Sequence, residues 1–377
     1  AQLITPGFNI AMVTSQLLNA WLVAAFGQRV GFLLAAAVFT LGSIIGGLGQ
    51  TFDMIVVGRI LQGVAAGIVQ PLVMVVAFQV FPVDRRGYAM AIYSMGIFLA
   101  VAAGPVFGGI AIDLLHWRYI FWAPLPVIGF AALTGWIFVP QAPSKERKSF
   151  DWIGYILLLI SVYCLVTAIT EGNREGWTSS HILRLFLVGI MAGATLIWTQ
   201  LQDWSTLIDL SLFRHKQFAM TALIAFVFGV GNFGTGYGVP VFGQLIQGMT
   251  PIVAALMMLP SARLIVVTLP FTGKLADSIP AHIGILIGLF LFAVGTIPMG
   301  GADVNTPFLL IMFYFIVSRL GMSFTNPFIM STALRSLPPE QLSAGGGMIN
   351  FSRQFGGSMG LTASVAFVEF RTQFHGD

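Results

Sequence analysis

Four arginines lie inside long apolar stretches of this sequence, where a charge is unusual. They are Arg59, Arg263, Arg319 and Arg353. A charge at membrane depth is costly, so such a residue normally faces a polar partner or a water-filled cavity. We expect Arg59 to line a cavity, where its guanidinium orients a bound molecule or senses a proton. The alternative is a structural arginine whose side chain extends toward the interface. The sequence favours no role for Arg263.

Polar residues at helical spacing accompany three of these arginines. At 100° per residue, four residues after Arg59 lie within about 60° of it on one helical face. They are Gln62, Gly63, Ala66 and Gln70. A similar stripe contains Arg319, Ser323, Asn326 and Met330, and Arg353 lies three residues after Asn350. Helix packing is an equal alternative for Arg319, and a structural role is slightly favoured for Arg353. The candidate cavity residues are Arg59, Gln62, Gln70, Arg319, Asn326, Asn350 and Arg353.

Groups that could carry protons lie elsewhere. None of the 14 acids is at a predicted midplane, and the five histidines fall in loops or at helix ends. Asp113 and Glu369, near helix ends, are the candidates for protonation among these residues. The sequence has no H-E-x-x-H, paired membrane aspartates, Ser/His pair or Walker loop. An intramembrane enzyme, a metal site, a cofactor and ATP drive are therefore disfavoured.

The composition defines the elements that must position these residues. Hydrophobic residues make up 57% of the 377 residues, charged residues only 8%, and the mean hydropathy is +0.89. A soluble or disordered chain would carry far more charge. We expect an all-α polytopic membrane protein, because about 20 apolar residues span a bilayer. Twelve stretches qualify, at about 7–26, 30–48, 54–80, 87–112, 116–139, 152–171, 181–201, 216–238, 250–271, 281–300, 306–334 and 343–370.

The distribution of basic residues predicts the orientation. Ten lysines and arginines fall in one set of alternate loops and four in the other. The loop after the first stretch is therefore cytoplasmic, and both ends of the chain are expected outside. The net charge of +4 fits loops that face anionic lipid better than a nucleic acid partner. The single cysteine, Cys164, excludes an internal disulfide.

Five short motifs occur one after another along the chain. They are Ala20–Arg29, Gly58–Gly67, Gly104–Gly109, Gly273–Ser278 and Arg353–Gly360. The first and fourth resemble the G-x-L-a-D-r-x-G-r-k loop of the major facilitator superfamily, and the second its R-x-x-q-G helix. The third resembles the G-P-x-x-G-G signature of exporters. The fifth resembles the R-Q-x-G-G-S-x-G run of the fourteen-helix drug:proton antiporter branch. The segment Trp117–Trp122 also resembles that branch.

This resemblance implies two pseudo-symmetric six-helix bundles plus two inserted helices. An offset of 253 residues relates the two loop motifs, with eight predicted helices between them. Residues 1–139 are then an N-terminal bundle without its first helix, and 140–205 a linker with two inserted transmembrane helices. Residues 206–377 are a C-terminal bundle without its last helix. We expect a helix before residue 1 with an acidic residue that faces the Arg59 stripe, because the branch carries an acid there.

The motifs also imply two mechanical sites. Gly104, Pro105, Gly108 and Gly109 form a conformational motif, and Gly96, Ala100, Gly104 and Gly108 are expected to make a close-packing face. Gly27, Arg29, Gly273 and Asp277 form a cytoplasmic gate, in which Asp277 caps or pairs across the gate. The first loop departs from the family, because Ala20 and Ala24 replace its glycine and aspartate.

The function that this resemblance implies is multidrug export in exchange for protons, by alternating access. A carrier of the same fold for fatty acids or other lipid-like amphiphiles is the alternative. The expected partners are the lipid bilayer, a small amphiphilic substrate and protons, with no nucleic acid. A periplasmic adaptor and an outer-membrane channel are implied by the resemblance alone. The expected location is the inner (plasma) membrane, crossed several times.

Overall fold

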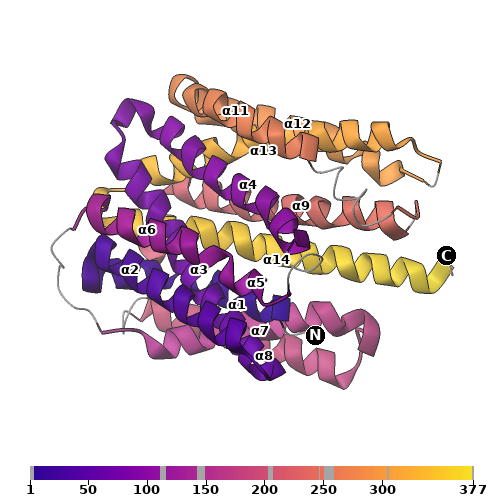
Figure 1. The fold of residues 1–377 in the computed structure, drawn as a ribbon, viewed down its shortest axis with the longest axis horizontal. Helices are drawn as coiled ribbons and strands as arrows, with labels where there is room; N and C mark the ends of the chain where they lie inside the picture. The colour runs from indigo at the N-terminus through magenta and orange to yellow at the C-terminus, as the bar shows by residue number, and fades with distance from the viewer. Residues whose placement is uncertain are drawn as a thin grey trace.

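The structure is a computed structural model that describes residues 4–110, 116–141, 149–202, 207–245, 247–249, 259–303 and 305–375. Its described residues form twelve helices of at least 12 residues (Figure 1). The helices, with the four-residue α5, are α1 (Ile4–Ser15), α2 (Leu18–Leu48), α3 (Phe52–Val80), α4 (Arg86–Ile110), α5 (Tyr119–Trp122), α6 (Pro124–Phe138), α7 (Trp152–Glu175), α8 (Ser180–Leu201), α9 (Lys216–Leu245), α11 (Leu259–Ser278), α12 (Ala281–Thr296), α13 (Phe308–Arg335) and α14 (Leu342–His375). By length and composition, eight membrane-spanning candidates occur in the described part.

The predicted stretches correspond to these helices, with differences in several places. The stretch 116–139 is divided into α5 and α6, and α11 continues to Ser278, beyond the predicted end at 271. A further difference is at the N-terminus. The stretch predicted at 7–26 is divided, because α1 ends at Ser15 and α2 begins at Leu18. The predicted boundary near residue 27 is instead a kink inside α2. Gly27 has φ 81° there, a left-handed conformation that glycine adopts without steric cost. The turn at 16–17 lacks glycine and proline, so the sequence gives no sign of it.

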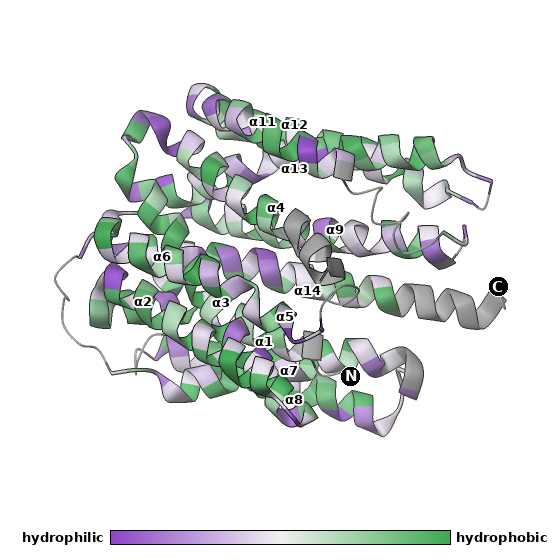
Figure 2. Ribbon diagram, in the orientation of Figure 1, coloured by the Kyte–Doolittle hydropathy of each residue, from purple (hydrophilic) through white to green (hydrophobic). Residues whose placement is uncertain are grey.

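Local sequence signals begin several helices. The side chains of Thr51, Asp151 and Ser179 accept hydrogen bonds from backbone N–H groups in the first turns of α3, α7 and α8. Such caps satisfy donors that have no partner inside the helix. The outward surface is apolar, with Phe130, Trp136 and Phe290 more than 60% exposed, as lipid contact requires. Figure 2 shows this distribution along the helices.

The helices pack as two groups joined at one end. In the first group α3 packs against α1 and α2, and α6 packs against α2. In the second, α9 packs against α14, and α13 packs against α11 and α12. Helix α4 belongs to the first group by sequence but packs mainly against α11, and α3 also meets α14. The pair α7–α8 packs beside both groups, because α7 contacts α1 and α14. Figure 1 shows α4 and α14 running between the two groups.

Candidate functional site

Arg319 is held by two helices of the second group. Its side chain is only 7% exposed and lies on α13 beside α9. Nη1 donates to Asn232 Oδ1 at 2.6 Å, and Nη2 donates to Thr235 Oγ1 at 2.9 Å. The guanidinium carbon lies 4.5 Å from the ring centre of Phe315, a cation–π distance. The Nε–H is buried and has no acceptor among the described residues. All these partners are neutral.

Arg353 lies where the two groups meet. Its side chain is 5% exposed, Nη2 donates to Asn350 Oδ1 at 3.2 Å, and the buried Nε–H has no acceptor. Asn350 Nδ2 in turn donates to Met74 Sδ on α3 at 3.3 Å. The hydroxyl of Tyr93 on α4 lies close to both Arg353 and Asn350. Asn350 therefore links α14 to α3, and the Tyr93 hydroxyl, which has no hydrogen-bond partner among the described residues, places a polar group of α4 beside them.

Arg59 lies beside α5 and is half-buried. Nη1 donates to Gln62 Oε1 at 3.3 Å, and the guanidinium lies 4.6 Å from the Phe121 ring centre. Gln62 is fully buried and donates to Ser43 Oγ on α2 at 2.8 Å. Arg59 and Gln62 are thus bound to neighbouring helices, with α2 on one side and α5 on the other. Only the later part of the predicted stripe, at Ala66 and Gln70, reaches a cavity.

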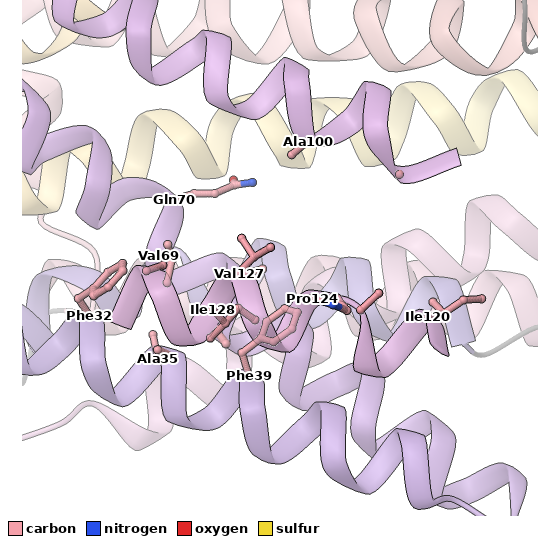
Figure 3. Close-up of a pocket in the computed structure, with 16 residues that line it drawn as sticks. Phe32, Ala35, Phe39, Val69, Gln70, Ala100, Ile120, Pro124, Val127 and Ile128 are labelled. Atoms are coloured by element: carbon pink, nitrogen blue, oxygen red, sulfur yellow. The ribbon is translucent and has the colours of Figure 1, made fainter. Parts of the chain in front are cut away.

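That cavity, of about 680 Å³, lies among α2, α3, α4, α5 and α6 (Figure 3). Among the described residues, Gln70 is the only polar side chain in its lining, and Figure 3 shows it pointing into the space between α3 and α4. Gln70 Oε1 accepts from Gln16 Nε2 at 3.3 Å. The rest of the lining consists of Phe32, Ala35, Ala36, Phe39, Ala65, Ala66, Val69, Ala100, Gly104, Ile120, Ala123, Pro124, Val127, Ile128 and Ala131. Such a surface suits an apolar neighbour.

The second half shows what occupies the equivalent place. The sequence offset relates α12, α13 and α14 to α2, α3 and α4. Helix α9 packs against α13 and α14, and its Phe228 contacts Phe292 of α12. A Cβ on Gly357 would meet the Phe233 ring at 2.5 Å, whereas one on Gly104, its counterpart, would meet no atom within 4 Å. The cavity is therefore the counterpart of a helix position.

The described residues lend no support to the close-packing interpretation of the α4 glycines. Gly96 and Gly104 have no described atom within 4 Å of an added Cβ, so no described helix packs closely against α4 at these two positions. At Ala100 and Gly104 the face borders the cavity. Pro105, Gly108 and Gly109 lie in the last turns of α4, and their side chains are outside the description, so their proposed conformational role stays a prediction.

The gate residues of the second loop meet the start of α4. Asp277, near the end of α11, accepts from the N–H groups of Gly87 at 2.6 Å and Tyr88 at 2.9 Å. Arg335 on α13 donates to the same carboxylate at 2.5 Å. An added Cβ on Gly273 would lie 2.4 Å from Ala91 Cβ, so glycine allows α11 and α4 to approach closely. Asp277 thereby joins α4 to α11 and α13.

The first loop forms a different set of contacts. Arg29 Nε donates to the Val139 carbonyl at the end of α6, at 2.8 Å. Gln28 donates to Gln79 on α3, at 2.7 Å. Both bonds stay within the first group. Ala24 replaces the aspartate of the motif. Near this loop, Asn19 Nδ2 of α2 donates a hydrogen bond to the Ser343 carbonyl of α14, at 3.2 Å. The two loops are therefore unequal in charge.

The remaining candidates fall in different surroundings. Asn326 and Met330 are buried on α13, and the neighbouring Ser323 accepts from Thr268 of α11 rather than facing α9. Arg263 is exposed. Asp113 lies outside the described residues, and Glu369 lies in α14 with its side chain outside the description.

Sequence reasoning missed three participants and one cluster. Tyr93, Asn232 and Thr235 became visible only through their contacts with arginines far along the chain. A signal existed for the last two, since they are three residues apart in an apolar stretch. Glu171, Glu175 and His181 place ligand-type atoms within 4.8 Å of one another near the connection between α7 and α8. His181 Nδ1 and Glu175 Oε2 are 2.6 Å apart, as an exposed pair.

Comparisons with known proteins agree with this architecture. A profile described as Major Facilitator Superfamily matches residues 1–361. The chain is 28% identical to the uncharacterised MFS-type transporter YhcA of Bacillus subtilis, over 99% of this chain and 70% of that protein. It is 27% identical to the lincomycin resistance protein LmrB of Listeria monocytogenes, over 87% of this chain and 69% of that one. The chain is also 27% identical to the multidrug export protein EmrB of Escherichia coli, over 98% of this chain and 72% of that protein.

Solved structures share the fold. The human organic anion transporter MFSD10 superposes with a TM-score of 0.67 at 14% identity, over 96% of this chain and 77% of that one. The proton:xylose symporter XylE superposes with a TM-score of 0.66 at 14% identity, over 98% of this chain and 79% of that one. At this identity the likeness concerns the helix arrangement alone.

Proposed function

Because the chain belongs to the major facilitator superfamily, we propose that it exports amphiphilic drugs or other toxic compounds in exchange for protons. Members of this family are transporters, so the proposal concerns cargo and coupling. The two helix groups alternate access to a site between them, as expected for carriers built from repeats. The residue ranges 1–139, 140–205 and 206–377 remain our proposed division into bundle, inserted pair and bundle.

The contact that carries the proposal is the clasp at Asp277. It joins the beginning of α4 to α11 and α13 through one carboxylate, at the end predicted to be cytoplasmic. This contact between the two helix groups supports a carrier that is closed toward the cytoplasm. Opening requires the Asp277 bonds to break.

The direction and cargo rest on relatives. LmrB and EmrB, named for lincomycin resistance and multidrug export, align with most of the chain. Export of amphiphiles is also compatible with the apolar surroundings of Arg319, where Phe315 and Met322 contact the guanidinium. Export of fatty acids or related lipids remains the alternative cargo. The proposed location is the inner (plasma) membrane, and an adaptor with an outer-membrane channel is a proposed partnership.

Transport by the full chain in liposomes tests the proposal. A fluorescent amphiphilic drug is added outside, and a proton gradient is imposed across vesicles with the chain in a known orientation. We expect drug movement that requires the gradient and stops with a protonophore. Asp84→Asn, which removes an exposed acid near the clasp, serves as the control that retains transport. Gradient-independent movement, or equal movement in empty liposomes, contradicts the proposal.

A further inference from the structure

We infer that the cargo carries an anionic group, which binds at Arg319 with Asn232 and Thr235 as supporting residues. This inference rests on the proposed function and names the substrate class of the same carrier. Its basis is the contrast between a buried cation and the neutral groups that surround it. The apolar residues next to the guanidinium supply the second half of the argument, because they fit the rest of an amphiphile.

The first step concerns unused hydrogen-bonding capacity. A guanidinium has five N–H donors and accepts nothing. At Arg319, Asn232 Oδ1 and Thr235 Oγ1 take one bond each, and the buried Nε–H has no acceptor. A neutral amide and a hydroxyl orient the guanidinium without cancelling its charge. A carboxylate or sulfonate can accept from Nε and a neighbouring Nη together, which is the geometry that arginine favours.

The second step concerns charge balance inside the bundle. Among the described residues, ion pairs join Arg85 to Asp84, Arg335 to Asp277 and His181 to Glu175, all near helix ends. Arg319 and Arg353 have none, although both are more than nine-tenths buried. A buried charge without a counter-charge is unfavourable. The described interior therefore attracts an anion and disfavours a cation.

The third step concerns space and depth. Arg319 lies 11 residues from the start of α13, or about 16 Å along the helix, near the middle of a bilayer about 30 Å thick. On α9 an added Cβ at Gly236 would lie 3.8 Å from Arg319 Nη2, which is an ordinary van der Waals contact. Glycine at this position therefore places no α9 side-chain atoms against the guanidinium.

The fourth step concerns the apolar part of the cargo. Phe315, whose ring lies under the guanidinium, packs in a cluster with Val239 and Ile311, and Phe242 borders it. This cluster continues the site along α9 and α13 on the side away from the clasp. An acidic head on Arg319 and an aromatic or aliphatic body against the Phe315 cluster satisfy both features. The structure thus favours amphiphilic organic anions.

Two probes with the same ring and opposite permanent charge test the inference. They are 2-naphthalenesulfonate and 2-naphthyltrimethylammonium, offered to the full chain in liposomes with a proton gradient. We expect at least tenfold faster movement of the sulfonate. Arg319→Gln should lower sulfonate movement at least tenfold without lowering ammonium movement, and Arg319→Lys should retain the preference for the anion. Arg184→Gln, which removes an exposed arginine of α8, should change neither.

The outcomes separate the two proposals. Folding of each variant is checked by thermal unfolding in detergent, and sulfonate binding to a variant that folds but does not transport is measured by titration. Equal movement of both probes, faster movement of the ammonium, or unchanged sulfonate transport and binding in Arg319→Gln overturns the inference and leaves the export proposal standing. If neither probe nor a neutral drug moves with the gradient, the export proposal itself fails.

Discussion

Neutralising Asp277 should open the end of the carrier that this carboxylate closes. The change is Asp277→Asn, which keeps the size of the side chain. The carboxylate accepts two backbone N–H groups at the start of α4, from Gly87 and Tyr88, and pairs with Arg335. The two N–H bonds cross from α11 to α4, so they form only while these two helices are together, whereas the pair with Arg335 lies within the second group. Removing the charge therefore weakens the closed state selectively.

The magnitude follows from the bonds. Hydrogen bonds to a charged group contribute roughly 1.5–3 kcal/mol each. The negative charge of Asp277 also interacts favourably with the positive N-terminal end of the α4 dipole, which adds about 0.3–1 kcal/mol. The Arg335 side chain is 34% exposed, so its pair with Asp277 contributes at most about 1 kcal/mol. In Asp277→Asn the amide oxygen still accepts hydrogen bonds and keeps part of this stabilisation, so the closed state loses about 2–4 kcal/mol. At 1.4 kcal/mol per tenfold change, the closed-to-open ratio should fall about 30- to 700-fold.

Cysteine labelling measures this shift. Leu269 is buried on α11 against Ala91 of α4, so Leu269→Cys becomes reactive when the two helices separate. The reporter is placed in a Cys164→Ala background, because Cys164 is the only native cysteine. Maleimide labelling from the predicted cytoplasmic side should accelerate at least tenfold with Asp277→Asn and remain unchanged with Asp84→Asn. A rate within threefold of the parent refutes the clasp reasoning.

Four further changes test other parts of the structure. Arg59→Ala should abolish efflux while expression stays near normal, and efflux at the parental rate would make Arg59 purely structural. Gly229→Ala should lower thermal stability by about 1–3 kcal/mol, because the added Cβ would lie 2.1 Å from a backbone oxygen of α14. Gly104→Ala, with open space, should be neutral in the same unfolding assay. Gln200→Leu should destabilise by about 1–3 kcal/mol, since it leaves the buried Asp151 carboxylate without one donor, and unchanged unfolding would contradict this.

Helix positions could be predicted from sequence because hydropathy and length reflect the bilayer directly. Caps at Thr51 and Ser179 and the special conformation of Gly27 are local properties as well. The break between α1 and α2 was not predictable, because residues 16–17 carry no turn signal. Hydropathy averages over about a helix length, so a two-residue interruption inside an apolar segment does not change it.

The candidate site was predictable only in part, because periodicity defines a face but not what lies opposite it. Gln62 and Gln70 share the Arg59 face by angle, yet Gln62 bonds to Ser43 on α2 while Gln70 borders the cavity. The two glutamines lie at different depths along α3, so each has different neighbours. The partners of Arg353 required the packing of α3 and α4 against α14. Tyr93 in particular lies 260 residues before Arg353 and is not part of any of the motifs described above.

The two arginines related by the repeat show how one architecture produces two chemistries. Arg59 and Arg319, 260 residues apart, both lie over a phenylalanine, at 4.6 and 4.5 Å. Arg59 then bonds to Gln62 of its own helix, whereas Arg319 bonds across to Asn232 on α9. The difference follows from the neighbours, because α9 stands in the second half where the first half has an apolar cavity. Arg319 is therefore oriented by a second helix in buried surroundings, which is what recognition of an anionic group requires.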